Sequence, residues 1–403
     1  MNPTFQRLMQ EVKRLTTSGQ LRDATQAIQR ALGGATTGAT TVDTPRVDVR
    51  PDAPHARAPC ADTLSPFANA MPSLAFESSA TVVERGAPRN RHPGRGEFVA
   101  GKHTLATLTR RYKLYVPPAP TDRPLPLVVM LHGCTQDPDD FAAGTGMNGL
   151  ANEHGFCVLY PAQAQDANPS RCWNWFKHNH QGRERGEAAL IATMTQAVMQ
   201  QRGIDPARVY IAGLSAGGAM ASLVAAAYPE LFAAVGVHSG LAPGAAQSLV
   251  EGLAAMRSGA GGPGGVLARP LQGLAGSTIR PGLSSLPVPA IVFHGDQDPT
   301  VHPSNGEQVI AAVLDSGLRP AAALASAPAV EKGISLKGQR YTRTVYGVGA
   351  GAGPAVAEHW VVHGAGHAWS GGQAAGSYTN AQGPDASLAM LRFFFSQAAH
   401  TGH

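Results

Sequence analysis

The sequence predicts an α/β protein in which a mostly parallel central sheet of about eight strands is flanked by helices. Short apolar runs alternate along the chain with helical patterns, and most of the middle runs are continuously apolar, which is typical of strands buried on both faces. One run, Val209–Ala212, stops at Gly213-Leu-Ser-Ala-Gly217 and continues into an Ala-rich helical pattern. A serine at such a strand–turn–helix junction indicates the nucleophile elbow of an α/β-hydrolase sheet.

The expected elements follow from these patterns in chain order. We expect strands at Arg110–Val116, Leu125–Leu131, Phe156–Tyr160, Val209–Ala212, Ala233–His238, Ala290–His294, Thr342–Tyr346 and Glu358–Val362. We expect helices at Asp139–His154, Gly186–Arg202, Ser215–Tyr228, Asn305–Ser316 and Asp385–Gln397. The first strand alternates polar and apolar residues, which predicts an edge strand.

Composition divides the chain into three parts. Residues 1–33 carry apolar positions three and four apart, broken at Ser18-Gly19, and predict a short helical N-terminal arm of two amphipathic helices. Residues 34–95 are rich in Ala, Thr, Pro, Arg and Gly without a period, which predicts a disordered linker. Residues 96–398 hold the strand–helix alternation and form the predicted catalytic domain. Within it, residues 257–286 and 321–337 look like surface insertions.

Bulk properties exclude several classes of protein. The 403 residues carry a net charge of only +5, and no Lys/Arg block is interleaved with aromatic residues, so nucleic-acid binding is not expected. There is no apolar run long enough to span a membrane. The first ten residues lack the apolar core of a signal peptide, so we expect a cytoplasmic protein, or a secreted one if the true start lies upstream. No oligomeric state is predicted.

The elbow defines half of a candidate oxyanion hole. Ser215 is the expected nucleophile, and the backbone N–H of Ala216 lies at a helix N-terminus beside the oxyanion that forms when a carbonyl is attacked. The second donor is expected in His132-Gly-Cys-Thr-Gln136, directly after the strand at Leu125–Leu131. We prefer the amide of Cys134, with Thr135 as the alternative.

The other catalytic groups are expected after later strands. Gly295-Asp-Gln-Asp-Pro299 follows one strand, and we prefer Asp298 as the triad carboxylate, with Asp296 as a turn-forming side chain that bonds its own loop. His363-Gly-Ala-Gly-His367 follows the last strand. His367 is the expected general base, because it lies in a Gly-flanked loop, and His363 is expected to be structural. Ser, Asp and His fall in the order of an α/β hydrolase.

Aromatic and cysteine residues suggest the substrate side of the site. Four aromatic residues are candidates for the floor of an acyl or polymer-chain pocket, with hydrophobic plugs as the equal alternative: Trp173, Trp175, Phe176 and Trp369. Cys134 and Cys172 are a hypothetical disulfide, although reduced thiols are the default in a cytosolic protein. His178 and His180 lack a third ligand with suitable spacing, so no metal is expected, and neither is a cofactor.

Six motifs together resemble the polyhydroxybutyrate (PHB) depolymerase-type esterases. They are His132-Gly-Cys-Thr-Gln136, Cys172-Trp-Asn-Trp-Phe176, Gly213-Leu-Ser-Ala-Gly217, Val237-His-Ser-Gly240, His294-Gly-Asp-Gln-Asp-Pro-Thr-Val-His302 and Gly364-Ala-Gly-His-Ala-Trp-Ser-Gly371. The resemblance spans roughly residues 96–398 and implies a triad at Ser215, Asp298 and His367. That family includes poly(3-hydroxybutyrate) depolymerases, feruloyl and acetylxylan esterases and simple carboxylesterases.

The sequence therefore predicts a serine esterase acting through an acyl-enzyme, with poly(3-hydroxybutyrate) or its oligomers as the expected substrate. The alternatives are a feruloyl, acetylxylan or general short-chain carboxylesterase, and an acyltransferase outcome stays open. In a non-catalytic alternative the protein is a granule-associated scaffold. We expect the N-terminal helices to dock on the protein's own body or to dimerise, and contact with a polymer or granule surface is the alternative.

Overall fold

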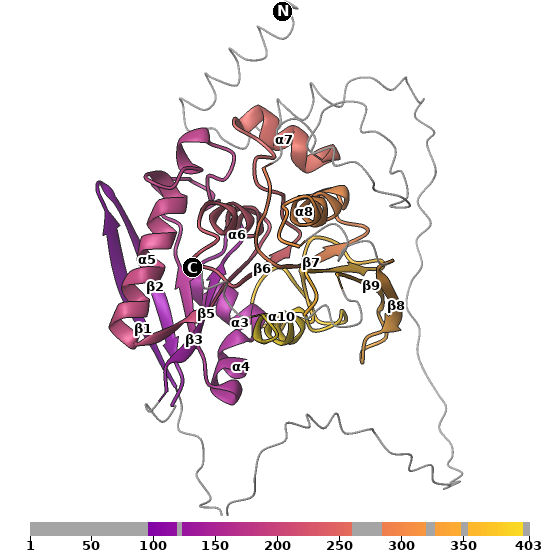
Figure 1. The fold of residues 1–403 in the computed structure, drawn as a ribbon, viewed down its shortest axis with the longest axis horizontal. Helices are drawn as coiled ribbons and strands as arrows, with labels where there is room; N and C mark the ends of the chain where they lie inside the picture. Colours follow the sequence, from indigo (N-terminus) through magenta and orange to yellow (C-terminus); the bar gives the residue numbers. More distant parts are fainter. Residues whose placement is uncertain (1–95, 119–122, 260–283, 320–326, 348–353, 398–403) are drawn as a thin grey trace, which may run out of the picture. The chain divides into compact units, whose positions relative to one another are not determined.

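The computed structural model describes residues 96–118, 123–259, 284–319, 327–347 and 354–397 (Figure 1). These residues all belong to one compact unit, Gly86–His403. The predicted N-terminal helices (1–33) and linker (34–95) lie outside the described residues. Among the helices that are described, none is long and apolar enough to cross a membrane.

The core of the molecule is a ten-stranded sheet with the order β1-β2-β4-β3-β5-β6-β7-β10-β9-β8. Its strands are β1 (Glu97–Leu105), β2 (Leu108–Val116), β3 (Leu125–Leu131), β4 (Cys157–Pro161), β5 (Ile204–Leu214), β6 (Ala234–His238), β7 (Ala290–Gly295), β8 (Ala329–Ile334), β9 (Arg340–Tyr346) and β10 (Ala357–Val362). Strands β4, β3, β5, β6, β7 and β10 run parallel, and the pairs at either edge are antiparallel. The α/β-hydrolase prediction is confirmed.

Helices cover both faces of the sheet (Figure 1). One layer holds α5 (Gly186–Arg202), α6 (Ala216–Ala227), α7 (Leu249–Ser258) and α8 (Ser304–Leu314). The other holds α3 (Pro138–Thr145), α4 (Met147–His154) and α10 (Ala386–Phe395). Alternate residues of β3 enter the two hydrophobic clusters, Val129 on the α5/α6 side and Val128 on the other, and every residue of the strand after Leu125 is buried. Burial on both faces explains the continuous apolar runs. The short elements η1 (His178–His180), β11 (Trp369–Ser370) and β12 (Thr379–Asn380) lie in loops.

The structure corrects four predictions about the elements. The sheet has ten strands rather than about eight, and β2 lies inside it because the unpredicted β1 pairs along its outer side. The predicted insertion at 321–337 contains β8, whose side chains are almost all exposed and therefore carry no burial pattern. The single helix expected at Asp139–His154 is two helices, because Gly146 adopts a left-handed conformation (φ 64°) that ends α3.

Candidate active site

Ser215 lies on a sharp turn between β5 and α6, as the elbow motif predicts. Its backbone has φ 58° and ψ −121°, a strained combination for a residue with a side chain. A Cβ on Gly217 would lie 2.1 Å from the carbonyl oxygen of Leu131, and one on Gly213 would lie 2.4 Å from the Gly217 backbone. Only glycine fits at these two positions, because the helix start is pressed against β3 and against the end of its own strand.

His367 and Asp298 form a close pair in the loops after β10 and β7. Nδ1 of His367 lies 2.7 Å from Oδ2 of Asp298, whose side chain has no exposed surface. The other carboxylate oxygen accepts hydrogen bonds of 2.9 Å from the amides of Thr300 and Val301. Burial acts to raise the pKa of Asp298, but the hydrogen bonds from His367 and the two amides outweigh it and hold the pKa below its ordinary value. The carboxylate is therefore ionised and fixed beside the imidazole.

A second Asp–His pair lies next to the first. Oδ2 of Asp296 is 2.8 Å from Nδ1 of His363, and its other oxygen accepts from the Gly364 amide. Asp296 thus bonds the histidine loop, which corrects the expectation that it bonds its own turn. Nε2 of His363 lies 2.8 Å from the Thr342 hydroxyl, and about a third of the side chain of both His363 and Asp296 is exposed. With both ring nitrogens engaged, His363 fastens the loop to β9.

His238, at the end of β6, links the elbow to the histidine loop. Its carbonyl oxygen accepts from the Ser215 amide at 2.9 Å, and its Nε2 accepts from the Ser370 amide at 2.9 Å. Burial, assisted by the neighbouring His294 and His367 rings, lowers the pKa of His238 to about 3, so the ring stays neutral and keeps accepting. The sequence analysis assigned no role to His238, although its place at the carboxyl end of a predicted strand was the available signal.

Two backbone amides near Ser215 are free to bind an oxyanion. A Cβ on Gly133 would lie 3.7 Å from Cβ of Ser215, so the loop after β3 borders the nucleophile. The amide of Thr135 already donates to the carbonyl of Ser170 at 2.6 Å. Within the described residues, neither the amides of Cys134 and Ala216 nor the Ser215 hydroxyl has a hydrogen-bond partner. The arrangement favours Cys134 over Thr135 as the second donor.

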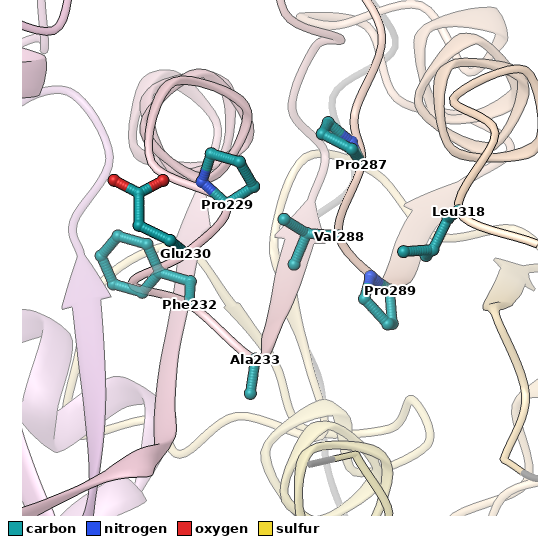
Figure 2. Close-up of a pocket in the computed structure, with 8 residues that line it drawn as sticks. All are labelled: Pro229, Glu230, Phe232, Ala233, Pro287, Val288, Pro289 and Leu318. Atoms are coloured by element: carbon teal, nitrogen blue, oxygen red, sulfur yellow. The ribbon is translucent and has the colours of Figure 1, made fainter. Parts of the chain in front are cut away.

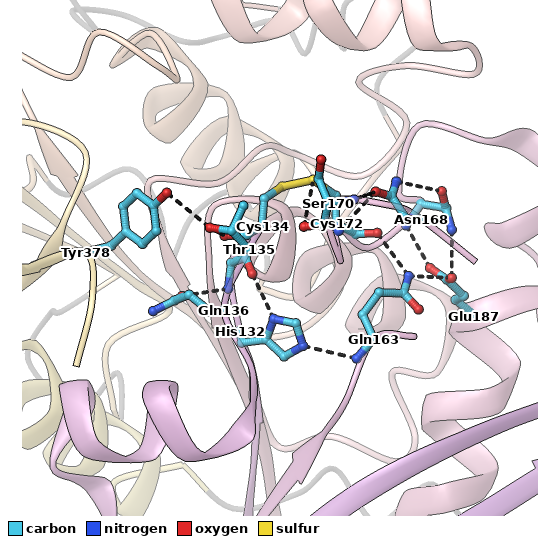
Figure 3. Close-up of a disulfide and its surroundings, with 12 residues drawn as sticks. His132, Cys134, Thr135, Gln136, Gln163, Asn168, Ser170, Cys172, Glu187 and Tyr378 are labelled. Carbon is cyan, nitrogen blue, oxygen red and sulfur yellow. Dashed lines mark hydrogen bonds between the residues drawn. A yellow bond between two sulfur atoms is a disulfide. The ribbon is translucent and has the colours of Figure 1, made fainter. Parts of the chain in front are cut away.

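A disulfide joins Cys134 to Cys172 and ties the loop after β3 to the aromatic loop (Figure 3). It is the pairing that the sequence suggested as a hypothesis. The third cysteine of the described residues, Cys157, is a buried free thiol whose pKa burial raises to about 11. The disulfide therefore restrains Cys134, whose backbone amide is the candidate oxyanion donor.

A buried glutamate organises the same two loops, and the sequence analysis missed it. Glu187, at the start of α5, is fully buried and accepts from the Asn174 amide at 2.7 Å and from Gln163 Nε2 at 2.6 Å. Gln163 also donates its side-chain amide to the Cys172 carbonyl and its backbone N–H to His132 Nε2 (Figure 3). A lone Glu in the first turn of a predicted helix gives no signal of this role. The network holds both ends of the disulfide-linked loops in place.

The structure buries most of the aromatic residues predicted to floor a pocket. Trp173 is 0% exposed and Trp369 1%, and Nε1 of Trp369 donates to the Ser387 hydroxyl at 3.0 Å. Both therefore pack in the core, which favours the hydrophobic-plug alternative for these two residues. Trp175 is 6% exposed, and Phe176, which packs edge-on against it, is only half-buried. Phe176 is thus the member of the set with most surface for a ligand.

A separate apolar hollow lies where β6 and β7 begin, at the opposite end of these strands from the triad residues (Figure 2). It is lined by Pro229, Glu230, Phe232, Ala233, Pro287, Val288, Pro289 and Leu318. None of these is a predicted site residue. No group of three or more His, Cys, Asp or Glu side chains placed to hold a metal ion occurs among the residues that the structure describes.

Comparison with known proteins gives a family match. A family model described as esterase PHB depolymerase matches residues 110–332, more than half of the chain. The chain is 37% identical to poly(3-hydroxyalkanoate) depolymerase C of Paucimonas lemoignei over 188 residues, which cover 46% of this chain and 43% of that protein. It is 30% identical to acetylxylan esterase A of Talaromyces purpureogenus over 232 residues, 57% of this chain and 59% of that protein.

The matched regions thus span about half the length of these relatives. Among solved structures, an acetyl xylan esterase from Aspergillus awamori superimposes with a TM-score of 0.52 at 20% identity, covering 74% of this chain and 99% of that one. At this identity the likeness shows the fold.

Proposed function

Because the chain belongs to the esterase PHB depolymerase family, we propose that it is a serine esterase that works through Ser215, His367 and Asp298. One observation carries the proposal: the strained elbow serine, the buried Asp298–His367 pair and two unpaired amides all lie at the carboxyl ends of neighbouring strands. These are the parts that ester hydrolysis through an acyl-enzyme requires.

In the proposed reaction the Ser215 oxygen attacks the ester carbonyl carbon and its proton passes to Nε2 of His367. The amides of Cys134 and Ala216 donate to the resulting oxyanion. When the tetrahedral intermediate collapses, the C–O bond to the alcohol breaks and His367 returns the proton to that leaving oxygen. Water then attacks the acyl-enzyme by the same route, and the acid is released. Asp298 holds the Nδ1–H tautomer of His367 and stabilises its cation.

Poly(3-hydroxybutyrate) or its oligomers are the substrate we favour. The support is the 37% identity to a poly(3-hydroxyalkanoate) depolymerase, compared with 28% to 32% for acetylxylan esterases. Those esterases, together with the fold match to one of them, make acetylated xylan, feruloyl esters or short-chain esters the alternative. Acyl transfer to an acceptor other than water would use the same acyl-enzyme.

The setting of the enzyme is also part of the proposal. The Cys134–Cys172 disulfide supports an oxidising compartment over the cytoplasm that the N-terminal sequence predicted. Contact with a polymer or granule surface through residues 1–33 is proposed on their amphipathic pattern alone. The scaffold alternative requires a catalytically silent site, which the Asp298–His367 pair argues against.

A substrate panel tests this function. Wild type, Ser215→Ala and the control Ser258→Ala are assayed on amorphous polymer, soluble oligomers, acetylated xylan and feruloyl esters. Among the described residues, the Ser258 hydroxyl hydrogen-bonds only the Ala254 carbonyl, at the end of α7. We expect wild type and Ser258→Ala to release 3-hydroxybutyrate from polymer or oligomers faster than they release acetate or ferulate from the other two substrates. Ser215→Ala should be inactive on all four. Acetate release without hydrolysis of polymer or oligomers would show that acetylated xylan is the substrate instead. If the wild type were inactive on every ester, the esterase proposal would fail and the non-catalytic scaffold alternative would remain.

A further inference from the structure

Tyr378 stands out in the segment that follows β11, residues 371–380. It is a non-glycine residue with φ 51°, and its side chain is 46% exposed, so neither backbone preference nor burial explains its conformation. Its carbonyl oxygen accepts a 2.7 Å hydrogen bond from the amide of Trp369, two residues beyond His367. The backbone of Tyr378 is thus fastened to the loop of the general base.

The hydroxyl of Tyr378 reaches the opposite side of the site. It lies 3.1 Å from Oγ1 of Thr135, the residue that follows the candidate oxyanion donor Cys134 (Figure 3). Oγ1 of Thr135 donates its one proton to the Cys134 carbonyl at 2.6 Å. Since that proton is engaged, Thr135 must accept and Tyr378 must donate. A chain of two hydrogen bonds thus runs from the Tyr378 hydroxyl through Oγ1 of Thr135 to the carbonyl of Cys134, the residue whose N–H is the candidate oxyanion donor.

The rest of the segment is held so that this contact persists. The carboxylate of Asp140 accepts from the Ser377 amide at 2.8 Å, from the Ser377 hydroxyl at 2.5 Å and from Nε2 of Gln136 at 2.9 Å. Burial acts to raise the pKa of Asp140, but these hydrogen bonds outweigh it and lower the pKa, so the carboxylate stays charged. A Cβ on Gly376 would lie 2.4 Å from the Asp140 carbonyl, which shows how closely the segment packs on α3.

Thr135 itself needs support. Its backbone has φ 67°, unfavourable for a β-branched residue, and the exposed Cys134–Thr135 corner has the disulfide on one side and Tyr378 on the other. The direction of the Cys134 N–H depends on this corner, because the N–H and the carbonyl that Thr135 holds are attached to the same Cα of Cys134, and fixing the carbonyl restricts the backbone torsions of that residue. Donors that are fixed before the charge develops are the ones that stabilise a transition state most.

We propose that Tyr378 is a positioning residue that couples the oxyanion loop to the loop of His367, its hydroxyl holding the Cys134 amide on the oxyanion. The inference rests on the proposed esterase function. Acylation and deacylation both pass through an oxyanion, so loss of the hydroxyl lowers kcat for every ester and leaves KM unchanged.

The test compares Tyr378→Phe with Tyr115→Phe. Tyr115 is the matched control, because its hydroxyl also makes one 3.1 Å hydrogen bond, to Asn152, and none to a residue of the proposed site. With p-nitrophenyl butyrate, we expect Tyr378→Phe to lower kcat about fivefold, the effect of one neutral hydrogen bond, with KM and Tm unchanged. Tyr115→Phe keeps the wild-type kcat.

A double-mutant cycle with Thr135, the hydrogen-bond partner of Tyr378, tests whether the two side chains act through each other. Thr135→Val removes the acceptor, so Tyr378→Phe should cost nothing further in that background. A wild-type kcat in Tyr378→Phe, additive losses in the double variant, or a raised KM at constant kcat would each overturn the proposal. The last result would make the ring a substrate contact. Because the wild type is assayed in parallel, an inactive wild type would refute the esterase proposal, whereas an active one isolates the role of Tyr378.

Discussion

The sharpest test of the proposed triad uses the two neighbouring Asp–His pairs, since their carboxylates, Asp296 and Asp298, lie only two positions apart in one loop. In Asp298→Asn, the remaining carbonyl oxygen can still accept from Thr300 and Val301. The new NH₂ group would then face Nδ1 of His367, now 2.7 Å from the carboxylate. It would donate to that nitrogen and force the proton to Nε2. Nε2 would then be unable to take the proton of Ser215.

The expected loss follows from that wrong tautomer. In the serine proteases where it has been measured, the same exchange lowers kcat about ten-thousandfold, or about 5.5 kcal/mol in the barrier. Asp296→Asn has no such effect, because His363 is held by Thr342 as well and its pair is partly exposed. We expect kcat within about threefold of wild type there, and a stability cost of at most about 1 kcal/mol.

The assay is hydrolysis of p-nitrophenyl butyrate by wild type and both variants, with Tm measured to show that each is folded. Tm of Asp298→Asn should indicate a folded protein, so that its loss of kcat reports chemistry. The assignment is refuted if folded Asp298→Asn retains more than a tenth of the wild-type kcat, or if Asp296→Asn is the more damaged variant.

Two further predictions concern stability. Cys172→Ala removes a cross-link between residues 38 positions apart. We therefore expect the free energy of unfolding to fall by up to about 4 kcal/mol and kcat to be reduced. A urea unfolding midpoint equal to that of wild type would contradict this prediction. The rings of His132 and His238 are neutral in the fold, because burial lowers their pKa values to about 4 and about 3. The unfolded chain, with pKa values near 6.5, binds more protons as pH falls from about 6.5 toward 4, so the folded state loses stability there. A urea midpoint that stays constant from pH 7 to pH 5 would count against this explanation.

The proposed catalytic residues could be placed from the sequence because each follows a recognisable strand. Continuous apolar runs mark the central strands, and the topology of a parallel sheet brings their carboxyl ends together. Ser215, Asp298 and His367 could therefore be proposed as the triad without coordinates. The choice of Asp298 over Asp296 matches the observed pairing with His367.

Other features depend on tertiary contacts that leave no local pattern. Strand β8 has almost no buried side chain, so its sequence lacks the signal of a strand. Trp369 lies beside the general base in sequence, yet it is buried, because it packs on Phe141 and on His238. In the sequence, Glu187 looks like an ordinary carboxylate in the first turn of a helix. Its role depends on Gln163 and Asn174, which donate to it from other loops in the folded protein. Position in the chain alone does not reveal such partners.

The most direct measurement is the site of covalent labelling by a fluorophosphonate, followed by tryptic mapping. Ser215, the proposed nucleophile, lies in the peptide between Arg208 and Arg257, which also contains Ser222, Ser239 and Ser248. We expect one label per active chain, on Ser215, none on Ser215→Ala, and loss of ester hydrolysis in proportion to labelling. A label on any other residue, or an unlabelled protein that still hydrolyses esters, would contradict it.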